Sequence, residues 1–311
     1  MKEWSNENPA VEQQSVRRVV EDNSVENLRE VIGQELPDLI VHDAHPIGEG
    51  ADNTTIEVNR EYVFRFPRKG REHRHSFEEE NKVLKALRGK TTTRLPEIEF
   101  EGKTYQWSGY KKIPGVQLKD VKEELTDTQR EQLAKDAALF LFELHNALPI
   151  SEAAEFGLKR PRGGPSREKL SDIRQLVNRE FPDEEMREFL LSSIDRYEHM
   201  LGEASPPQGL LHGDFHPGNI VVNPDTNRLN GVIDFGEVAI GDVYVDFAYQ
   251  FARDKDFAKA MMEEYSRLSG VEFSEDKMKV YGVMRILTHW HGDPKRVVRA
   301  KQWLEKLAVM V

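Results

Sequence analysis

Three polar side chains stand at short intervals within one stretch of the sequence. Asp214 lies in HGDFHPGNI, Asn219 follows a few residues later, and Asp234 opens the DFG of VIDFGE. Phosphoryl transfer needs a carboxylate that accepts the proton of the acceptor hydroxyl, and oxygen ligands that hold Mg²⁺ on the phosphates. The residue types and their spacing therefore predict Asp214 as the catalytic residue, with Asn219 and Asp234 as metal ligands.

The residues between these side chains predict a β-hairpin. Two short apolar runs, 219–223 and 229–235, are joined by a turn at 224–227. Such a hairpin would bring Asn219 and Asp234 close together. Polar residues beside Gly and Pro are also common in ordinary turns, so a purely structural role is the alternative for either half alone. Both halves in this order favour a phosphotransferase over a plain turn.

The first third of the chain has the alternating and β-branched pattern of strands. Residues 39–112 predict the order β-β-β-α-β-β, with a hairpin turn at 59–60 and a helix over 77–89. A short amphipathic helix is predicted over 24–33, with Gly33 as its stop.

From about residue 125 the apolar periodicity becomes that of helices. Helices are predicted over 126–148, 166–180 and 183–203, and from 246 onward. The change of pattern places a domain boundary near residues 114–115. The chain is therefore expected to form two lobes, 1–114 and 115–311.

Composition narrows the class of protein. The chain has 311 residues, of which 38% are hydrophobic and 32% charged, which indicates a globular protein with a sizeable core. It has no cysteine, which excludes disulfides, thiolate metal sites and a cysteine nucleophile. The net charge of −11 argues against a nucleic-acid partner and is compatible with a cationic small-molecule substrate, although acidic surfaces also serve solubility.

Targeting signals are also missing from the pattern. No stretch approaches the roughly 18 apolar residues of a membrane span, and the first residues lack the apolar centre of a secretory signal. We therefore expect a cytoplasmic enzyme that acts as a monomer on a small molecule, with no membrane partner.

The motifs HGDFHPGN and IDFGEVAIGD resemble the aminoglycoside phosphotransferase family, and the resemblance extends from about His42 to about Trp290. It implies an α+β, protein-kinase-like bilobal fold. A small lobe with a five-stranded antiparallel sheet and one main helix would bind the nucleotide (1–114, including an N-terminal helical extension). A larger helical lobe would hold the catalytic loop and the acceptor (115–311). A protein kinase is disfavoured, because only residues 237–243 separate DFG from the next helix and A-P-E is absent.

The resemblance also implies nucleotide-binding residues in the small lobe. GEGADNTT, residues 48–55, occupies the place of a phosphate-covering loop, which makes Gly50 and Asn53 candidates. A plain turn is the alternative, and a P-loop is excluded because Walker A is absent. Backbone groups of Lys111 and Ile113 are expected to meet the base of GTP or ATP.

The cation that should pair with the phosphates is Arg65, in FRFPRK, where kinases carry Lys. Macrolide phosphotransferases resemble this sequence here, with Arg in a similar stretch. The alternative is an exposed strand arginine. Glu80 is the expected helix partner of Arg65, because Val83, Leu84 and Leu87 turn that side of the helix toward the lobe.

The acceptor is predicted from charge. Glu237, Asp242 and Asp246 are acidic, with Glu237 expected to meet a substrate amine, while Asp242 and Asp246 are alternatively braces of the loop. The last helices are basic and aromatic, a poor lining for a polycation. Segments 144–170 and 265–278 resemble the macrolide branch. We therefore expect phosphate transfer from GTP or ATP to the amino-sugar hydroxyl of a macrolide. An aminoglycoside kinase, a metabolite kinase (choline, homoserine or ketosamine) and a pseudokinase remain alternatives.

Overall fold

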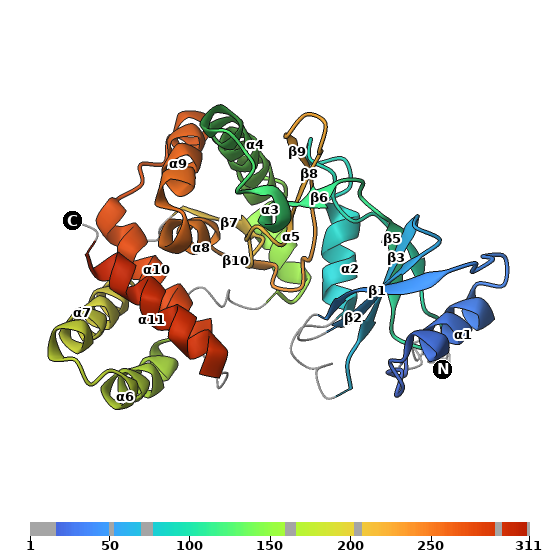
Figure 1. Ribbon diagram of the computed structural model, residues 1–311, viewed down its shortest axis with the longest axis horizontal. Coiled ribbons are helices and arrows are strands. Elements are labelled where there is room, and N and C mark those ends of the chain that lie inside the picture. The colour runs from blue at the N-terminus through green and yellow to red at the C-terminus, as the bar shows by residue number, and fades with distance from the viewer. Residues whose placement is uncertain are drawn as a thin grey trace, which may run out of the picture. The chain divides into compact units, whose positions relative to one another are not determined.

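The structure is a computed structural model that describes residues 17–49, 53–69, 77–158, 166–201, 207–289 and 294–309. Its chain divides into two compact units, one of Met1–Arg74 with Glu99–Tyr110 and the other of His75–Ile98 with Lys111–Val311. A strand-rich region followed by a helical region confirms the predicted α+β, kinase-like fold (Figure 1).

The first unit is a sheet with a helix packed on it. Its strands are β1 (Ala44–Glu49), β2 (Asn53–Val58), β3 (Tyr62–Pro67), β4 (Ile98–Glu101) and β5 (Ser108–Lys111), in the antiparallel order β1-β2-β3-β5-β4. Helix α1 (Val25–Glu35) buries Leu28 and Ile32 in the same cluster as Phe64 and Trp107. The predicted order β-β-β-α-β-β is confirmed, since α2 (Phe77–Ala86) lies between β3 and β4 in the chain.

The prediction that Gly33 stops the first helix is wrong, because α1 continues to Glu35. The buried Val31 and Ile32 hold this turn of the helix in the core of the first unit. Burying such side chains outweighs the cost of about 1 kcal/mol that a helical glycine carries relative to alanine.

The predicted turn at 59–60 is a left-handed hairpin turn. Asn59 and Arg60 have φ values of 54° and 55°, as a two-residue type I′ turn requires. The Asn59 side chain accepts a hydrogen bond from the His42 backbone N–H at 2.8 Å and donates to the Ile40 carbonyl at 2.8 Å. The turn therefore also fixes the chain that enters β1.

The second unit is mostly helical. Its helices are α2, α3 (Leu118–Val121), α4 (Asp127–His145), α5 (Ile150–Glu155), α6 (Leu170–Glu180), α7 (Glu184–Met200), α8 (Tyr244–Arg253), α9 (Lys255–Ser269), α10 (Glu275–His289) and α11 (Pro294–Ala308), with a 3-10 turn at Arg167–Lys169. Helix α4 begins with a capping box in which Thr126 and Gln129 satisfy each other's backbone N–H groups. The predicted helix over 126–148 is thereby confirmed, with its C-terminus at His145.

Short strands form two small sheets in this unit. They are β6 (Val116–Gln117), β7 (Gln208–Leu211), β8 (Ile220–Val222), β9 (Leu229–Val232) and β10 (Ala239–Asp242), in the orders β6-β8-β9 and β10-β7. The predicted strand over 229–235 is too long by three residues. It ends at Val232 because Asp234 has a φ of 66°, which lies outside the β region.

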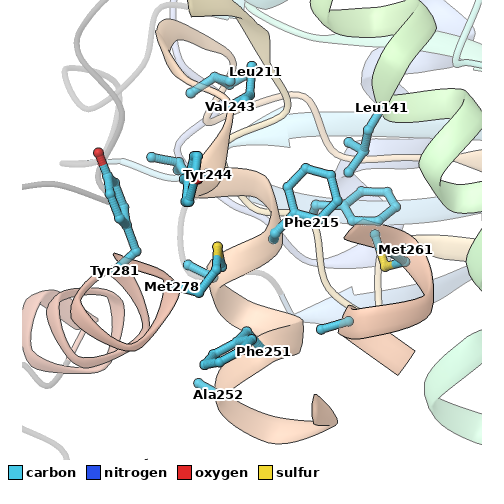
Figure 2. Packing of buried hydrophobic residues seen from close by; sticks show 14 of the residues in the cluster. Leu141, Leu211, Phe215, Val243, Tyr244, Phe251, Ala252, Met261, Met278 and Tyr281 are labelled. Carbon is cyan, nitrogen blue, oxygen red and sulfur yellow. The ribbon is translucent and has the colours of Figure 1, made fainter. Parts of the chain in front are cut away.

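The core of the second unit reaches the predicted catalytic loop through Phe215. Figure 2 shows this ring between Leu141 of α4 and Met261 of α9. Its centroid lies 5.8 Å from that of Phe140 in a stacked arrangement. Phe215 is almost fully buried, so the loop that carries Asp214 is anchored in the main hydrophobic cluster.

Within the described part of the chain, no helix has both the length and the apolar character that crossing a membrane requires.

Replacing Asn59 tests the turn. Asn59→Ala removes the side-chain hydrogen bonds and places a Cβ-bearing residue without local polar support at positive φ. We expect it to lower the free energy of unfolding by about 1–3 kcal/mol. Asn59→Gly keeps the conformational freedom and should cost less. Urea unfolding followed by circular dichroism measures both, and equal losses would show that the backbone conformation contributes nothing.

Candidate active site

The predicted metal ligands flank the hairpin of β8 and β9. Ile220 pairs with Val232 in the ladder, and the backbone N–H of Ile233 donates to the carbonyl of Asn219 at 2.9 Å. Asn219 and Asp234 are therefore brought together by backbone hydrogen bonds at the open end of the hairpin, as the sequence predicted.

The side chains at this end offer oxygen ligands. The amide nitrogen of buried Asn219 donates to the Asp214 carbonyl at 3.0 Å, which leaves its Oδ1 as the acceptor atom. Asp234 is exposed and is held at positive φ, a conformation that costs about 1–3 kcal/mol and recurs at functional sites.

An amide oxygen and a carboxylate are a donor set that suits Mg²⁺, which usually keeps several waters and phosphate oxygens among its ligands. The described residues contain no cluster of three or more His, Cys, Asp or Glu side chains able to hold a metal. Asn219 and Asp234 by themselves fit a magnesium ion that is carried in with nucleotide phosphates.

Asp214 lies between two basic side chains. Arg285 of α10 donates from Nη2 to its Oδ1 atom, and Nε2 of His216 lies 3.4 Å from its Oδ2 atom. Burial alone would raise the pKa of Asp214, but His216 and the charge of Arg285 outweigh it and hold that pKa well below the usual range. The carboxylate is ionised and oriented at neutral pH.

The neighbouring His212 links the loop that carries Asp214 to the strand before Asp234. Its Nε2 donates to the Ile233 carbonyl at 3.1 Å, and its Nδ1 accepts from the Asp214 backbone N–H at 3.3 Å. These two bonds require the neutral tautomer with the proton on Nε2. The ring is fully buried and lies 4.8 Å from the Phe235 ring, so it fixes the distance between the two halves of the motif.

Asp246, in the first turn of α8, holds the backbone of the same loop. Its Oδ2 accepts from the backbone N–H of His212 and its Oδ1 from that of Gly213, both at 2.8 Å. His145 donates to Oδ2 at 3.0 Å and in turn bonds Tyr265 at 2.8 Å. Burial would raise the pKa of Asp246, but the hydrogen bond and charge of His145, together with the Gly213 backbone N–H, lower it.

Asp242 is occupied in a similar way. It accepts from the Tyr244 backbone N–H at 3.1 Å and from the hydroxyl of Tyr281, and it pairs with Lys277 at 3.4 Å. Of the two roles that the sequence left open for Asp242 and Asp246, bracing is therefore the one that the geometry supports.

Gly213 allows the loop to approach Glu237. Gly213 has a φ of 79°, and a Cβ at this position would lie 2.1 Å from the Glu237 carbonyl oxygen. No other residue fits there without moving the backbone. The backbone of Glu237 is thus placed directly beside the loop that carries Asp214, and the substrate role of its side chain stays a prediction.

The residues predicted to bind nucleotide are distributed over both units. In the first unit, Arg65 is 6% exposed on β3, not an exposed strand arginine, and Asn53 begins β2. Glu57 lies on the same face of the neighbouring strand as Thr55, the partner of Arg65, and is also buried. Gly50 lies outside the described residues.

In the second unit, Glu80 is the buried glutamate of its helix, 4% exposed, while Glu78 is exposed. Glu80 therefore faces inward, the side of the helix that Val83, Leu84 and Leu87 predicted, and its pairing with Arg65 stays a prediction. Lys111 is exposed at the end of β5. Ile113 packs against Gly231 so closely that a Cβ added to Gly231 would lie 2.6 Å from the Ile113 side chain.

Sequence reasoning missed Arg285 and Tyr265. Arg285 lies in VMRIL on α10, and a cation between apolar residues on both sides is a signal that it pairs with a buried carboxylate. The sequence does not say which carboxylate that is. Tyr265 carries no such signal, because a tyrosine on an amphipathic helix is usually part of the core.

Comparison with known proteins identifies the family. Residues 43–281 match the model of the phosphotransferase enzyme family, and the chain belongs to this family.

Individual relatives agree with this assignment. An aminoglycoside 3'-phosphotransferase of Escherichia coli is 26% identical over 160 residues, 51% of this chain and 57% of that protein, so the match spans less than two thirds of the relative. The GDP complex of wild-type aminoglycoside 2'-phosphotransferase-IIIa has a TM-score of 0.75 at 24% identity, covering 92% of this chain and 98% of the other. Macrolide 2'-phosphotransferase MphH from Brachybacterium faecium has a TM-score of 0.65 at 17% identity, covering 90% and 97%. The two solved structures share the fold.

Asp246→Asn tests the brace. It replaces a buried carboxylate that holds His145 and two backbone N–H groups, so we expect a loss of about 3–5 kcal/mol in the free energy of unfolding. Because the folded-state pKa of Asp246 lies below the unfolded value of about 3.9, its contribution is fully present above that value. It is lost as the pH falls through the folded-state pKa.

The stability difference between wild type and Asp246→Asn should therefore stay constant from about pH 5 to 8 and shrink below about pH 4, as measured by urea unfolding. Asp195→Asn is the control, because Asp195 is 67% exposed and pairs only at the surface with Arg174. A difference between wild type and Asp246→Asn no larger than that of the control would contradict the brace.

Proposed function

We propose that the chain is a small-molecule kinase that transfers the γ-phosphate of GTP or ATP to a hydroxyl of an antibiotic amino sugar. One observation carries the proposal: Asp214, ionised and oriented, shares a single hydrogen-bonded loop with Asn219 and Asp234. Family membership supports the reaction class. GDP in an aminoglycoside phosphotransferase of the same fold supports a guanine nucleotide as one donor.

The chain's own residues divide the work. Asp214 accepts a hydrogen bond from the acceptor hydroxyl and takes its proton late, when transfer has made that hydroxyl acidic. Its low pKa makes it a poor base early in the reaction, which fits a role in orientation. Asn219 and Asp234 would hold Mg²⁺, whose charge, when it is bound, neutralises the triphosphate oxygens.

Roles in nucleotide binding are proposed for six further residues. Arg65 would grip the phosphates as a planar fork, with Glu80 as its helix partner. Gly50 and Asn53 would approach the phosphates through their backbone, and Lys111 and Ile113 would meet the base. The proposal thus assigns nucleotide contacts to residues 1–114 and acceptor contacts to 115–311.

The finer proposal is a macrolide acceptor, since two of the three candidate carboxylates are engaged elsewhere. Asp242 is bonded to Tyr281, and Asp246 to the loop backbone. Glu237, whose backbone lies against Gly213 of the loop that carries Asp214, is the acidic side chain proposed to meet the substrate amine. One carboxylate suits a large apolar substrate with one amino sugar better than a polycation.

A cationic stack beside the catalytic loop supports the same acceptor. The Arg253 guanidinium lies 3.4 Å from the ring centroid of Tyr249 and 3.6 Å from that of Trp303. The Tyr249 ring lies 5.2 Å from that of His216, which contacts Asp214. A positive charge near His216 disfavours a polycationic acceptor relative to a macrolide with one amine.

An aminoglycoside acceptor is the second candidate. It is favoured by the higher structural similarity to aminoglycoside 2'-phosphotransferase-IIIa, a TM-score of 0.75 against 0.65 for the macrolide enzyme. The curated relative from Escherichia coli is also an aminoglycoside enzyme.

A substrate panel tests the proposal. Phosphate transfer from GTP and from ATP would be measured to erythromycin, a 16-membered macrolide, kanamycin, gentamicin, choline and homoserine. Turnover of macrolides alone supports the finer proposal. Turnover of aminoglycosides alone would assign the second candidate. Choline or homoserine turnover would indicate a metabolite kinase, and bound nucleotide with no turnover a pseudokinase.

Asp214→Ala should lower kcat about 10²–10⁴-fold on the substrate that the panel identifies, because the hydroxyl loses its orienting carboxylate. Nucleotide affinity should stay nearly unchanged. Asp225→Ala, an exposed carboxylate in the turn of the same hairpin, is the matched control and should keep full activity. Loss of nucleotide binding together with activity would refute the role of Asp214.

Asp234→Ala should remove the metal dependence of nucleotide binding. Titration of a fluorescent nucleotide with and without MgCl₂ measures this, with Asp225→Ala again as the control. An Mg²⁺ effect in the variant equal to that in wild type would show that Asp234 is not a metal ligand.

A further inference from the structure

Side chains on one face of α10 contact the carboxylates of Asp242 and Asp214. Lys277, Tyr281 and Arg285 recur every four residues and so share a face of the helix. Lys277 and Tyr281 both contact Asp242, which ends β10. Arg285 contacts Asp214. The helix is therefore attached at two places to the elements that hold the loop.

Arg285 makes a two-point attachment. Its Nη1 donates to the Gly213 carbonyl at 3.1 Å, and its Nη2 donates to Oδ1 of Asp214. The guanidinium is 5% exposed, so these bonds are made out of water. Because the fork is planar and rigid, it fixes the carboxylate relative to the backbone of the preceding residue.

The second oxygen of Asp214 is held less completely. The Nδ1 atom of His216 accepts from the Gly218 backbone N–H at 3.0 Å, so its proton lies on Nε2, which faces Oδ2 at 3.4 Å. Arg285, a buried charged side chain, contacts Oδ1 more closely than His216 contacts Oδ2. Oδ2 is thus the oxygen with room for a further hydrogen bond, in a side chain that is 28% exposed.

We infer that Arg285 is a positioning residue for the reaction: it pins Oδ1 of Asp214 to the Gly213 carbonyl so that Oδ2 faces the acceptor hydroxyl. This inference rests on the proposed function of Asp214. Arg285 itself touches neither the nucleotide nor the acceptor. Its effect on turnover passes through one carboxylate and its loop.

The competing explanation is that Arg285 is only a structural ion pair. A buried arginine needs a counter-charge wherever it lies, and removing one partner destabilises the protein. That explanation predicts lower stability with unchanged turnover in the molecules that remain folded. A positioning role predicts a lower kcat at unchanged nucleotide KM.

The experiment compares Arg285→Met, Arg285→Lys and the control Arg196→Met. Arg196 of α7 pairs with Asp276, which lies on α10 like Arg285, but the Arg196 side chain is 53% exposed. We expect Arg285→Met to lower kcat about 10–100-fold with KM for nucleotide within about twofold, since misplacement of a reacting group by about 1 Å has effects of this size. Arg285→Lys keeps the charge but not the fork and should fall between wild type and Met. The control should equal wild type.

A double-mutant cycle with Asp214→Asn separates the two explanations. If Arg285 acts through the Asp214 carboxylate, Arg285→Met should lower kcat less than about twofold further in the Asp214→Asn background. An equal loss in both backgrounds would overturn the inference. So would an Arg285→Met variant that keeps wild-type kcat. Should Arg285→Met fail to fold, Arg285→Lys with a wild-type Tm and wild-type kcat would overturn it as well.

Failure of the proposed function gives a different result. If wild type phosphorylates nothing in the panel, the cycle is measured on nucleotide hydrolysis, with water as the acceptor. It is also measured on Tm, where Arg285→Met should cost about 5–10 °C and less in Asp214→Asn. Coupling in Tm without coupling in hydrolysis would leave Arg285 as a structural ion pair and refute the positioning role.

Discussion

The side of the second unit that carries Asp214, Asn219 and Asp234 depends on one buried carboxylate. Asp246 accepts the backbone N–H groups of His212 and Gly213 and is held by His145 of α4. A buried carboxylate is costly unless its oxygens are satisfied, and here three donors satisfy it. The hydrogen bonds offset the cost of burying this carboxylate. They also join three parts of the chain at one residue: the start of α8, the end of α4 and the backbone before Asp214.

Beyond Asp246, the conformation of the loop is fixed by a series of local contacts. The left-handed Gly213 lets the chain pass against Glu237, and Phe215 returns it to the core. Asn219 bonds the Asp214 carbonyl and pairs through its own carbonyl with Ile233. Each step is a backbone or buried contact, so the geometry of the polar side chains is inherited from the packing of α4, α8 and α9.

How far the sequence predicts this depends on the kind of interaction. The hairpin, the turn at Asn59 and the long helix α4 follow from local pattern, and the structure has them within a few residues. The spacing of Asp214, Asn219 and Asp234 is local too, so those side chains could be located, although their roles remain proposals. Arg285 could not be assigned to Asp214, because 71 residues separate them and only the packing of α10 joins them. The predicted helix stop at Gly33 is wrong because tertiary burial overrides a local stop signal.

The burial of Phe215 also bears on how such a protein can change over generations. A loop rooted in the main hydrophobic cluster is insulated from substitutions at the surface, so drift there leaves the reacting geometry intact. Tyr249, which is partly exposed and lies next to His216 of this loop, can vary without removing Phe215 from the core. Substitutions at the surface around the loop can therefore accumulate while its buried anchor stays unchanged.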